Sequence, residues 1–89
     1  MASTEKINIL RNEIDKLDKQ IVDLLLQRFS KAKKIGEIKN INSIDIDDLI
    51  RENNIIETLS GKSDENLKKK DISAIFKLIF TISKKLQIK

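Results

Sequence analysis

The chain lacks cysteine, histidine and proline, and it has only two glycines among its 89 residues. Without cysteine there is no disulfide and no thiolate nucleophile. Without histidine the commonest general base and the usual zinc ligand are missing. Residues 1–20 are charged throughout, unlike a signal peptide, and no apolar run approaches the length of a membrane span. We therefore expect a soluble, cytoplasmic protein whose chemistry needs neither a metal nor a nucleophile.

The formal charge of +4 is spread unevenly along the chain. Residues 1–39 carry nine basic and six acidic side chains, residues 40–60 one and five, and residues 61–89 eight and three. An acidic segment between two basic ones indicates internal complementarity rather than a continuous nucleic-acid-binding stripe. No aromatic residues are interleaved with the basic ones for base stacking, which also argues against single-strand binding.

The first part of the chain carries a heptad seam, in which apolar residues alternate at spacings of three and four. Its members are Ile7, Leu10, Ile14, Leu17, Ile21 and Leu24. Position 28 continues the register but is Arg28, and the seam resumes at Ile35 and Ile38. The pattern predicts one helix from about residue 5 to about residue 40, about 50 Å long. Gly36 is interpreted as a fraying end or a site of close helix approach.

Two shorter helices are predicted after the long one. Residues 40–43 form a loop, Ser43 and Asp45 are the candidate caps of a helix that runs to about Ser60, and Gly61 fits the position after its end. Residues 61–70 form a polar connector, and Asp71 is the candidate cap of the third helix. The residues expected to face inward are Ile46, Leu49, Ile50, Ile56 and Leu59, then Ile72, Ile75, Ile79, Ile82 and Leu86, with Phe76 and Phe80 widening the stripe.

These elements predict a single all-α domain over residues 1–89, with one long helix and two shorter ones. A helix of about 50 Å is too long to be covered by two shorter helices of its own chain. A chain this small also gains stability by oligomerising. We therefore expect a homodimer in which the long helices pair and the short helices pack across both chains.

Eight polar residues flank or interrupt the apolar seams, and their spacing favours a cation-rich pocket at the edge of the core. They are Arg11, Arg28, Lys39, Asp48, Arg51, Glu52, Ser83 and Gln87. Arg28 takes a core-facing position, where a guanidinium group needs an anion. Lys39 lies about three turns further along the same face, so these two side chains are placed to hold a small dianion. Arg11 lies about 25 Å from Arg28 along the helix and reaches such a pocket only from a partner chain.

The remaining polar residues also share helix faces, at spacings of three and four. Asp48, Arg51 and Glu52 form one group, and Ser83 and Gln87 form another. Each has a plainer interpretation, because charged residues beside a seam are usually solvated or paired at the surface. That interpretation predicts a non-catalytic helical interaction module, whereas the combination of all eight favours a binding pocket.

Five segments that contain these residues resemble, in order, the all-helical class of chorismate mutase. The first is Leu10 to Asp18, with an arginine followed by an Ile-Asp-x-Leu-Asp run. The others are Leu24 to Arg28 (Leu-Leu-x-x-Arg), Gly36 to Lys39 (Gly-x-x-Lys), Asp48 to Glu52 (Asp-x-x-Arg-Glu) and Ser83 to Gln87 (Ser-x-x-x-Gln). The resemblance covers nearly the whole chain. It implies an intertwined homodimer of three-helix chains that converts chorismate to prephenate without a cofactor, toward phenylalanine and tyrosine.

The resemblance also implies a role for each of the eight residues. Arg11 of the partner subunit and Arg28 hold the two carboxylates of the substrate, and Lys39 and Gln87 donate hydrogen bonds to the ether oxygen. Asp48 and Glu52 lie near the ring hydroxyl, Ser83 supports a carboxylate, and Arg51 contributes positive potential and orders the acidic pair. Lys39, Gln87, Arg28 and Glu52 are thereby the expected catalytic residues.

This chemistry agrees with the composition of the chain. The rearrangement is pericyclic and intramolecular, so it needs no nucleophile, metal or net proton transfer. Two effects lower its barrier, namely restriction of the substrate to its reactive conformer and stabilisation of negative charge on the breaking ether oxygen. The nearest rival is a lyase on the same fold that eliminates pyruvate from isochorismate, because it needs the same cationic grip.

Overall fold

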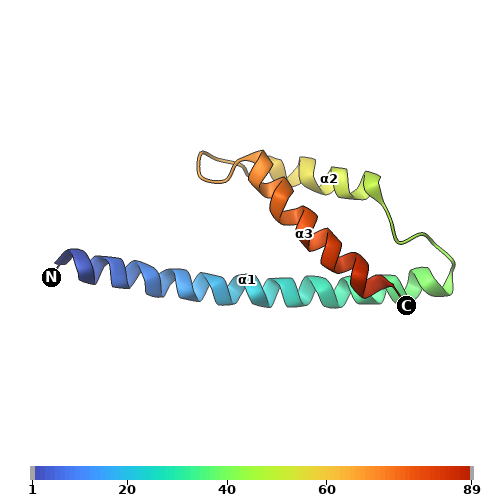
Figure 1. The fold of residues 1–89 in the computed structure, drawn as a ribbon, viewed down its shortest axis with the longest axis horizontal. Helices are drawn as coiled ribbons and strands as arrows, with labels where there is room; N and C mark the ends of the chain where they lie inside the picture. The colour runs from blue at the N-terminus through green and yellow to red at the C-terminus, as the bar shows by residue number, and fades with distance from the viewer. Residues whose placement is uncertain (1, 89) are drawn as a thin grey trace. The chain divides into compact units, whose positions relative to one another are not determined.

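The structure, a computed structural model, describes residues 2–88, which form three α-helices and no strand (Figure 1). Helix α1 covers Ala2–Ile41, α2 covers Leu49–Ser60 and α3 covers Lys69–Gln87. The predicted all-α fold, with one long helix followed by two shorter ones, is confirmed. Within this described stretch, no helix is long and apolar enough to cross a membrane.

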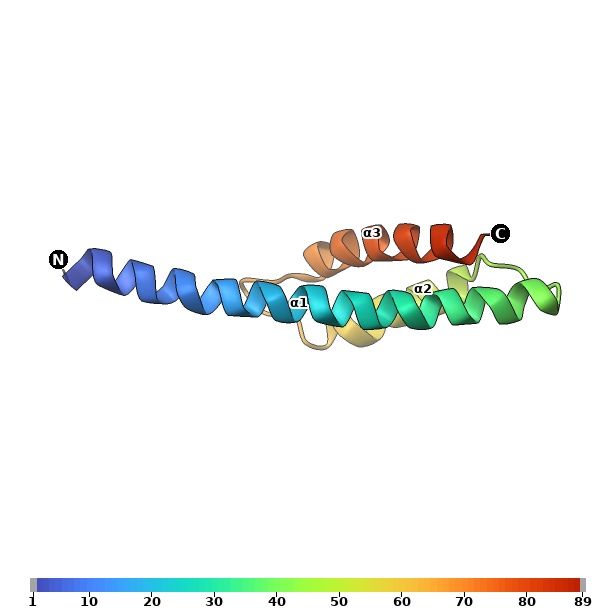
Figure 2. The ribbon, with the colours of Figure 1, turned by 90° about the horizontal axis from the view of Figure 1, so that it is seen from below.

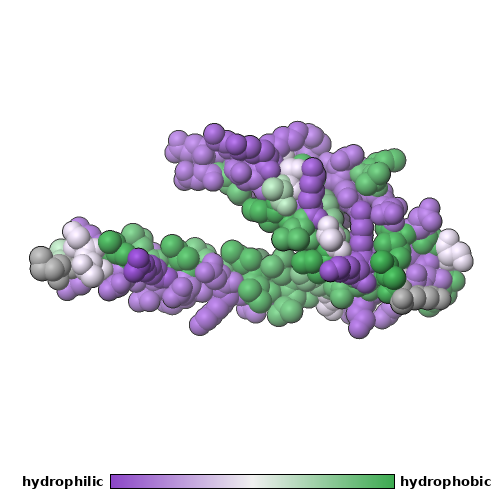
Figure 3. All heavy atoms as spheres, in the orientation of Figure 1, coloured by the Kyte–Doolittle hydropathy of each residue, from purple (hydrophilic) through white to green (hydrophobic). Residues whose placement is uncertain are grey.

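The chain divides into two compact units, of which the first is Met1–Ser30. Its described residues belong to α1, whose predicted seam forms one side of the helix. Hydrophobic residues gather along one edge of this stretch in the space-filling view (Figure 3). The six seam residues from Ile7 to Leu24 are 49–63% exposed. The heptad pattern is therefore present as a continuous apolar face that the single chain leaves open.

The second unit, Lys31–Lys89, contains the end of α1 together with α2 and α3. Helices α2 and α3 pack against each other, and the last turn of α3 meets the last turns of α1 (Figures 1 and 2). The buried residues are Ala32 and Gly36 of α1 and Ile72, Phe80 and Ser83 of α3. The rings of Phe76 and Phe80 are tilted by 60° with their centres 6.0 Å apart. The core of this unit is therefore small and centred on α3.

The start of α2 differs from the prediction. Neither Ser43 nor Asp45 caps it. Ser43 takes the left-handed conformation (φ 55°) in a turn that ends α1, closed by the Ile44 N–H donating to the Lys39 carbonyl at 2.8 Å. This is the hydrogen-bond pattern of a helix C-terminus that usually places glycine at the left-handed position. Because this turn and a connector use the residues up to 48, Asp48 is the cap, and its Oδ1 accepts from the Arg51 N–H at 3.0 Å.

The ends that surround the second connector also differ in detail. Gly61 follows the last residue of α2 as predicted, but its φ of −62° is right-handed, so its backbone freedom is not used. Helix α3 begins at Lys69 rather than after Asp71. Asp71 lies inside the first turn, and its Oδ2 accepts from the Lys68 N–H at 3.0 Å. An aspartate at this position stabilises a helix start by reaching back to an unpaired N–H group.

The inward face of α2 is narrower than predicted. Leu49 and Ile50 are 66% and 77% exposed, and both were expected to face the core. The half-buried residues step by three and four along the helix, and they are Glu52, Ile55, Ile56, Leu59 and Ser60. Ile50 points away from this face, and Leu49 is the first helical residue, directly after the connector. The structure therefore places a glutamate on the packed side of α2.

The packed face of α3 is rotated from the predicted stripe toward the phenylalanines. Ile72 and Phe80 are buried, and Phe76 and Ile79 are half-buried. Three residues expected to face inward, Ile75, Ile82 and Leu86, are 51%, 36% and 39% exposed. The large Phe rings take the centre because they bury more apolar surface than the isoleucines beside them. This rotation also brings Ser83 into the core.

Candidate functional site

The eight predicted site residues are divided between the two units. Arg11 and Arg28 belong to the first, where Arg11 is exposed and Arg28 is half-buried. The other six belong to the second. Of these, Lys39, Glu52, Ser83 and Gln87 are buried or half-buried, whereas Asp48 and Arg51 are exposed. The second unit therefore holds a set of inward polar side chains, one or two from each of its helices.

Lys39 lies in the last turn of α1, directly before the connector of residues 42–48. Its Nζ donates to the backbone carbonyl of Ile46 at 3.3 Å. Because the turn at Ser43 folds the chain back after α1, this carbonyl comes within reach of a side chain seven residues earlier. The ammonium group is thereby held over the connector instead of extending into solvent.

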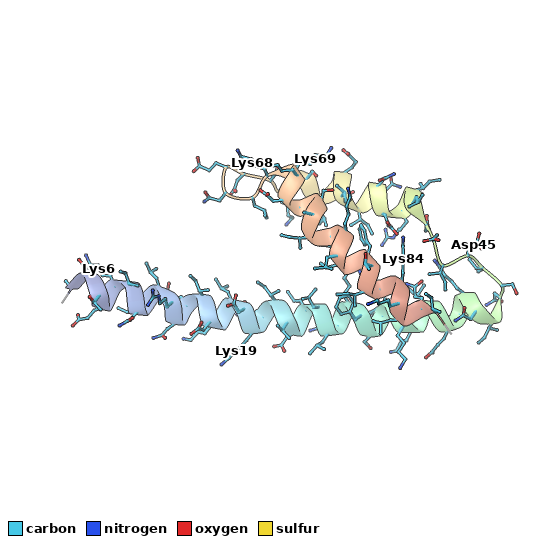
Figure 4. All side chains as sticks on the ribbon, viewed as in Figure 1. Lys6, Lys19, Asp45, Lys68, Lys69 and Lys84 are labelled. Carbon is cyan, nitrogen blue, oxygen red and sulfur yellow. The ribbon has the colours of Figure 1, made fainter. Side chains whose placement is uncertain are left out.

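A second ammonium group reaches the same connector from α3. The Nζ of Lys84 lies 2.9 Å from Glu52 Oε2 and 3.0 Å from Asp47 Oδ1. These hydrogen bonds, first that to Glu52 and then that to Asp47, raise the pKa of Lys84 above its ordinary value of 10.5. Lys84 projects from the turn of α3 that faces α2 and the connector (Figure 4). One lysine thus joins three elements of the unit.

The two lysines are attached to consecutive residues of the connector. Lys39 holds the carbonyl of Ile46, and Lys84 holds the carboxylate of Asp47. Two cationic side chains are therefore attached to this end of the connector, and one of them, Lys84, also pairs with the half-buried Glu52 of α2. In such a partly dehydrated place, electrostatic interactions are stronger than at an open surface.

Gln87 lies where α3 meets α1. Its backbone carbonyl accepts from Asn40 Nδ2 at 2.9 Å, and Gly36 gives the room for this approach. Its side-chain Oε1 is buried and has no hydrogen-bond partner among residues 2–88. Ser83, one turn earlier on α3, is 6% exposed. Two polar side chains at a spacing of four thus share the interior side of the last turns of α3, and Ser83 lies deeper than the edge of the core where the sequence placed it.

Asp48, Arg51 and Glu52 do not share one environment at the start of α2, because Asp48 caps the helix. Asp48 precedes the helix and uses Oδ1 to accept the Arg51 N–H, so it lies at the exposed end of the helix. Arg51 is also exposed, and only Glu52 is on the packed face. The predicted common face of these three residues is therefore divided between a capping role, an exposed cation and a half-buried carboxylate.

Three polar residues of the site were not singled out from the sequence, namely Asn40, Asp47 and Lys84. Lys84 had a signal, since it follows Phe76 and Phe80 at spacings of eight and four and so extends the stripe that the structure buries. Asn40 and Asp47 had none. Their roles depend on where α3 ends relative to α1 and on the path of the connector, and neither follows from periodicity.

A shallow hollow of about 330 Å³ borders the other side of the contact between α1 and α3. Lys33, Glu37 and Asn40 line it from α1, with Leu86 and Gln87 from α3. These α1 positions lie about 100–160° around the helix from Lys39, at 100° per residue. The hollow is therefore separate from the group of Lys39, Glu52 and Lys84.

A family model and individual known proteins that are similar to this chain agree on one family. Residues 10–88 match the family model described as chorismate mutase type II. The chain is 34% identical over 84 residues to a chorismate mutase from Methanocaldococcus jannaschii, which covers 93% of this chain and 85% of that protein.

Two bifunctional chorismate mutase/prephenate dehydratases are also similar. The chain is 42% identical over 55 residues to that of Aquifex aeolicus and 37% identical over 81 residues to that of Buchnera aphidicola subsp. Acyrthosiphon pisum. These matches cover 62% and 89% of this chain. The chain spans only 15% and 21% of the length of these two relatives.

Proposed function

We propose a site and a mechanism for this chain. The chain belongs to the type II chorismate mutase family. It is therefore an isomerase that rearranges chorismate to prephenate in aromatic amino acid biosynthesis. The structural observation that supports the site is that Lys39, Glu52, Ser83 and Gln87 all belong to one compact unit. These residues come from all three helices, and each is buried or half-buried.

In the reaction, the ether C–O bond of the substrate breaks while a C–C bond forms within the same molecule. Negative charge grows on the ether oxygen as the bond lengthens. We assign the Lys39 ammonium group and the Gln87 side-chain amide as its two donors. A pair of preorganised donors in a partly dehydrated site stabilises this charge more than water does, and each is worth about 3 kcal/mol.

The substrate carries two carboxylates, and these require cations. We assign Arg28 to one of them and Arg11 of the partner subunit to the other, with Ser83 supporting a carboxylate. A guanidinium group binds a carboxylate through two parallel hydrogen bonds, which fixes its orientation as well as its position. Holding both carboxylates restricts the flexible substrate to its compact, reactive conformer.

The ring hydroxyl is assigned to the two acidic residues at the start of α2, Asp48 and Glu52. Glu52 is the principal acceptor, because it is half-buried and its carboxylate is held by Lys84. Asp48 contributes from the exposed end of the helix, and Arg51 adds positive potential. No step in this mechanism requires a cofactor.

We propose that two chains form an intertwined homodimer, with residues 1–89 of each acting as one catalytic domain in the cytoplasm. The support is the apolar face of α1, whose six seam residues are 49–63% exposed in the single chain. Such a heptad face is stabilised by a partner helix. A second chain would also supply Arg11 to the site.

The first experiment follows the loss of chorismate absorbance in the ultraviolet after purified protein is added, and then acidifies the product to phenylpyruvate. Rapid loss with phenylpyruvate formed is the expected result. The same protein is tested with isochorismate, because pyruvate release from that substrate would identify the lyase instead. Turnover of neither substrate by a folded dimer would contradict both activities and favour an interaction module.

A further inference from the structure

We infer that Lys84 is a positioning residue of this site, which orients the carboxylate of Glu52 and offsets acidic charge where a dianionic substrate binds. The inference rests on the proposed function, because it requires Glu52 to face the substrate. It concerns a residue outside the eight that the sequence singled out. It depends on the contacts that join α3 to α2 and to the connector.

The geometry makes Glu52 the main partner of Lys84. The Nζ of Lys84 lies 2.9 Å from Glu52 Oε2 and 3.0 Å from Asp47 Oδ1. The Glu52 side chain is 21% exposed, that of Lys84 is 31% exposed, and that of Asp47 is 78% exposed. Ion pairs gain strength as water is excluded, so the bond to Glu52 is the stronger of the two.

The contact fixes the orientation of a carboxylate as well as its charge. Glu52 belongs to the first turn of α2 and Lys84 to the last turn of α3, so the bond ties together the two helices. Lys84 occupies Oε2, and we assign Oε1 of Glu52 to the ring hydroxyl. An ionised carboxylate only accepts hydrogen bonds, so it suits a hydroxyl donor.

The same contact also lowers the negative charge that a dianionic substrate would meet at this end of the connector. Asp47 and Glu52 together carry two negative charges, which would repel a dicarboxylate. The positive charge of Lys84 reduces the net charge of this group to −1. Lys39 is anchored on the carbonyl of Ile46, directly beside Asp47, so both lysines lie at this end of the connector. Without Lys84, a half-buried carboxylate would face the substrate uncompensated, and substrate binding would weaken more than the chemical step.

The test compares Lys84→Met with the matched variant Lys85→Met, which removes an exposed lysine from the same turn of α3. We expect Lys84→Met to raise KM about tenfold while kcat changes by less than about threefold, the scale of one partly screened charge contact. Lys85→Met should leave both constants unchanged, and Lys84→Arg should restore a KM near that of the wild type. Equal KM values for Lys84→Met and the wild type would overturn the inference.

A double-mutant cycle separates positioning from direct substrate contact. Glu52→Gln removes the charge that Lys84 compensates, so adding Lys84→Met to that variant should raise KM by less than about threefold. The same tenfold rise in both backgrounds would show that Lys84 does not act through Glu52. Loss of kcat and thermal stability without a rise in KM would indicate a purely structural role and would also overturn the inference.

Two controls keep the outcome interpretable. If Lys84→Met does not fold, Lys84→Gln keeps a polar side chain with a hydrogen-bond donor but lacks the charge, and it should show the same rise in KM. Wild-type protein that fails to turn over chorismate would contradict the proposed function itself. Active wild type with an unaffected Lys84 variant would contradict only the role of Lys84.

Discussion

A Cβ atom added to Gly36 would lie 2.5 Å from the Cα of Gln87, so α1 and α3 approach each other there at backbone distance. Gly36 is buried, and one turn further on Asn40 donates to the Gln87 carbonyl at 2.9 Å. The position of the Gln87 amide therefore depends on the absence of a side chain on the opposite helix. This relationship connects the Gly-x-x-Lys and Ser-x-x-x-Gln segments, which are far apart in the sequence.

We expect Gly36→Ala to reduce activity strongly, because the added methyl group can be accommodated only if the end of α3 moves. Overpacking of this kind typically costs about 1–3 kcal/mol in stability, and the displaced Gln87 amide would also lose its alignment with the ether oxygen. Chorismate turnover and the thermal midpoint are measured together. Gly61→Ala is the control, because its new Cβ would meet only the Thr58 carbonyl at 3.3 Å, and it should remain active.

Gln87→Glu should make activity depend on pH. An amide donates a hydrogen bond at every pH, whereas a carboxyl group donates only when it is protonated. The variant should therefore gain activity toward acid and lose it as the new carboxyl group ionises. The measurement is kcat/KM across the acidic range, with the wild type as control. A variant that follows the wild-type profile would remove Gln87 from the ether-oxygen role.

Arg11→Ala and Arg28→Ala should each abolish turnover while the dimer stays intact. Mixing the two inactive proteins should restore part of the activity, because in a heterodimer one of the two sites would contain both arginines. Subunit exchange is verified first with differently tagged chains. No recovery after confirmed exchange would contradict a site that takes Arg11 from the partner subunit.

The ion pairs of Lys84 should stabilise the protein at neutral pH and stop doing so in strong alkali. The pKa of Lys84 is raised above 10.5 in the folded chain, so its contribution is fully present below 10.5 and is lost as the pH rises through the folded value. The difference in unfolding free energy between wild type and Lys84→Met should shrink as the pH rises from 9 to beyond 11, about the range of lysine titration. A constant difference would show that charge is not the cause.

Ser43→Gly should stabilise the fold without changing the site. Ser43 has a φ of 55° in the turn that ends α1, a conformation that costs a residue with a Cβ more than it costs glycine. After allowing for the greater freedom of glycine in the unfolded chain, the gain should be about 0.5–1 kcal/mol. Chemical denaturation measures it, and Ser43→Ala, which keeps the Cβ, should show no gain.

The helices themselves could be predicted from the sequence because their signals are local. The alternation of three and four from Ile7 to Leu24, and again along residues 72–86, is repeated often enough to predict the number and order of helices. The residues at which the second and third helices start were predicted less well. Ser43 and Asp45 are good caps by type, but the left-handed turn at Ser43 moved the start of α2 to Asp48.

In the candidate site as well, features local to one helix could be predicted from the sequence, and contacts between elements could not. Ser83 and Gln87 were singled out because their spacing of four places them on one face of α3, beside the apolar seam. Lys84 was missed because a lysine beside a seam is usually solvated, and only the approach of Glu52 and Asp47 from other elements gives it partners. The inward position of Glu52, with Asp48 and Arg51 exposed, likewise depends on where the connector delivers the first turn of α2.

The sequence alone determined the all-helical class, the long helix with its apolar face, the family resemblance and most of the polar residues of the candidate site. These properties follow from side-chain type and spacing within one helix, which is a short-range matter. The tertiary structure decided which residues meet, namely Gly36 with Gln87, Lys39 with the carbonyl of Ile46, and Lys84 with Glu52. Such contacts depend on the path of the connectors and on the rotation of each helix about its axis, and periodicity specifies neither.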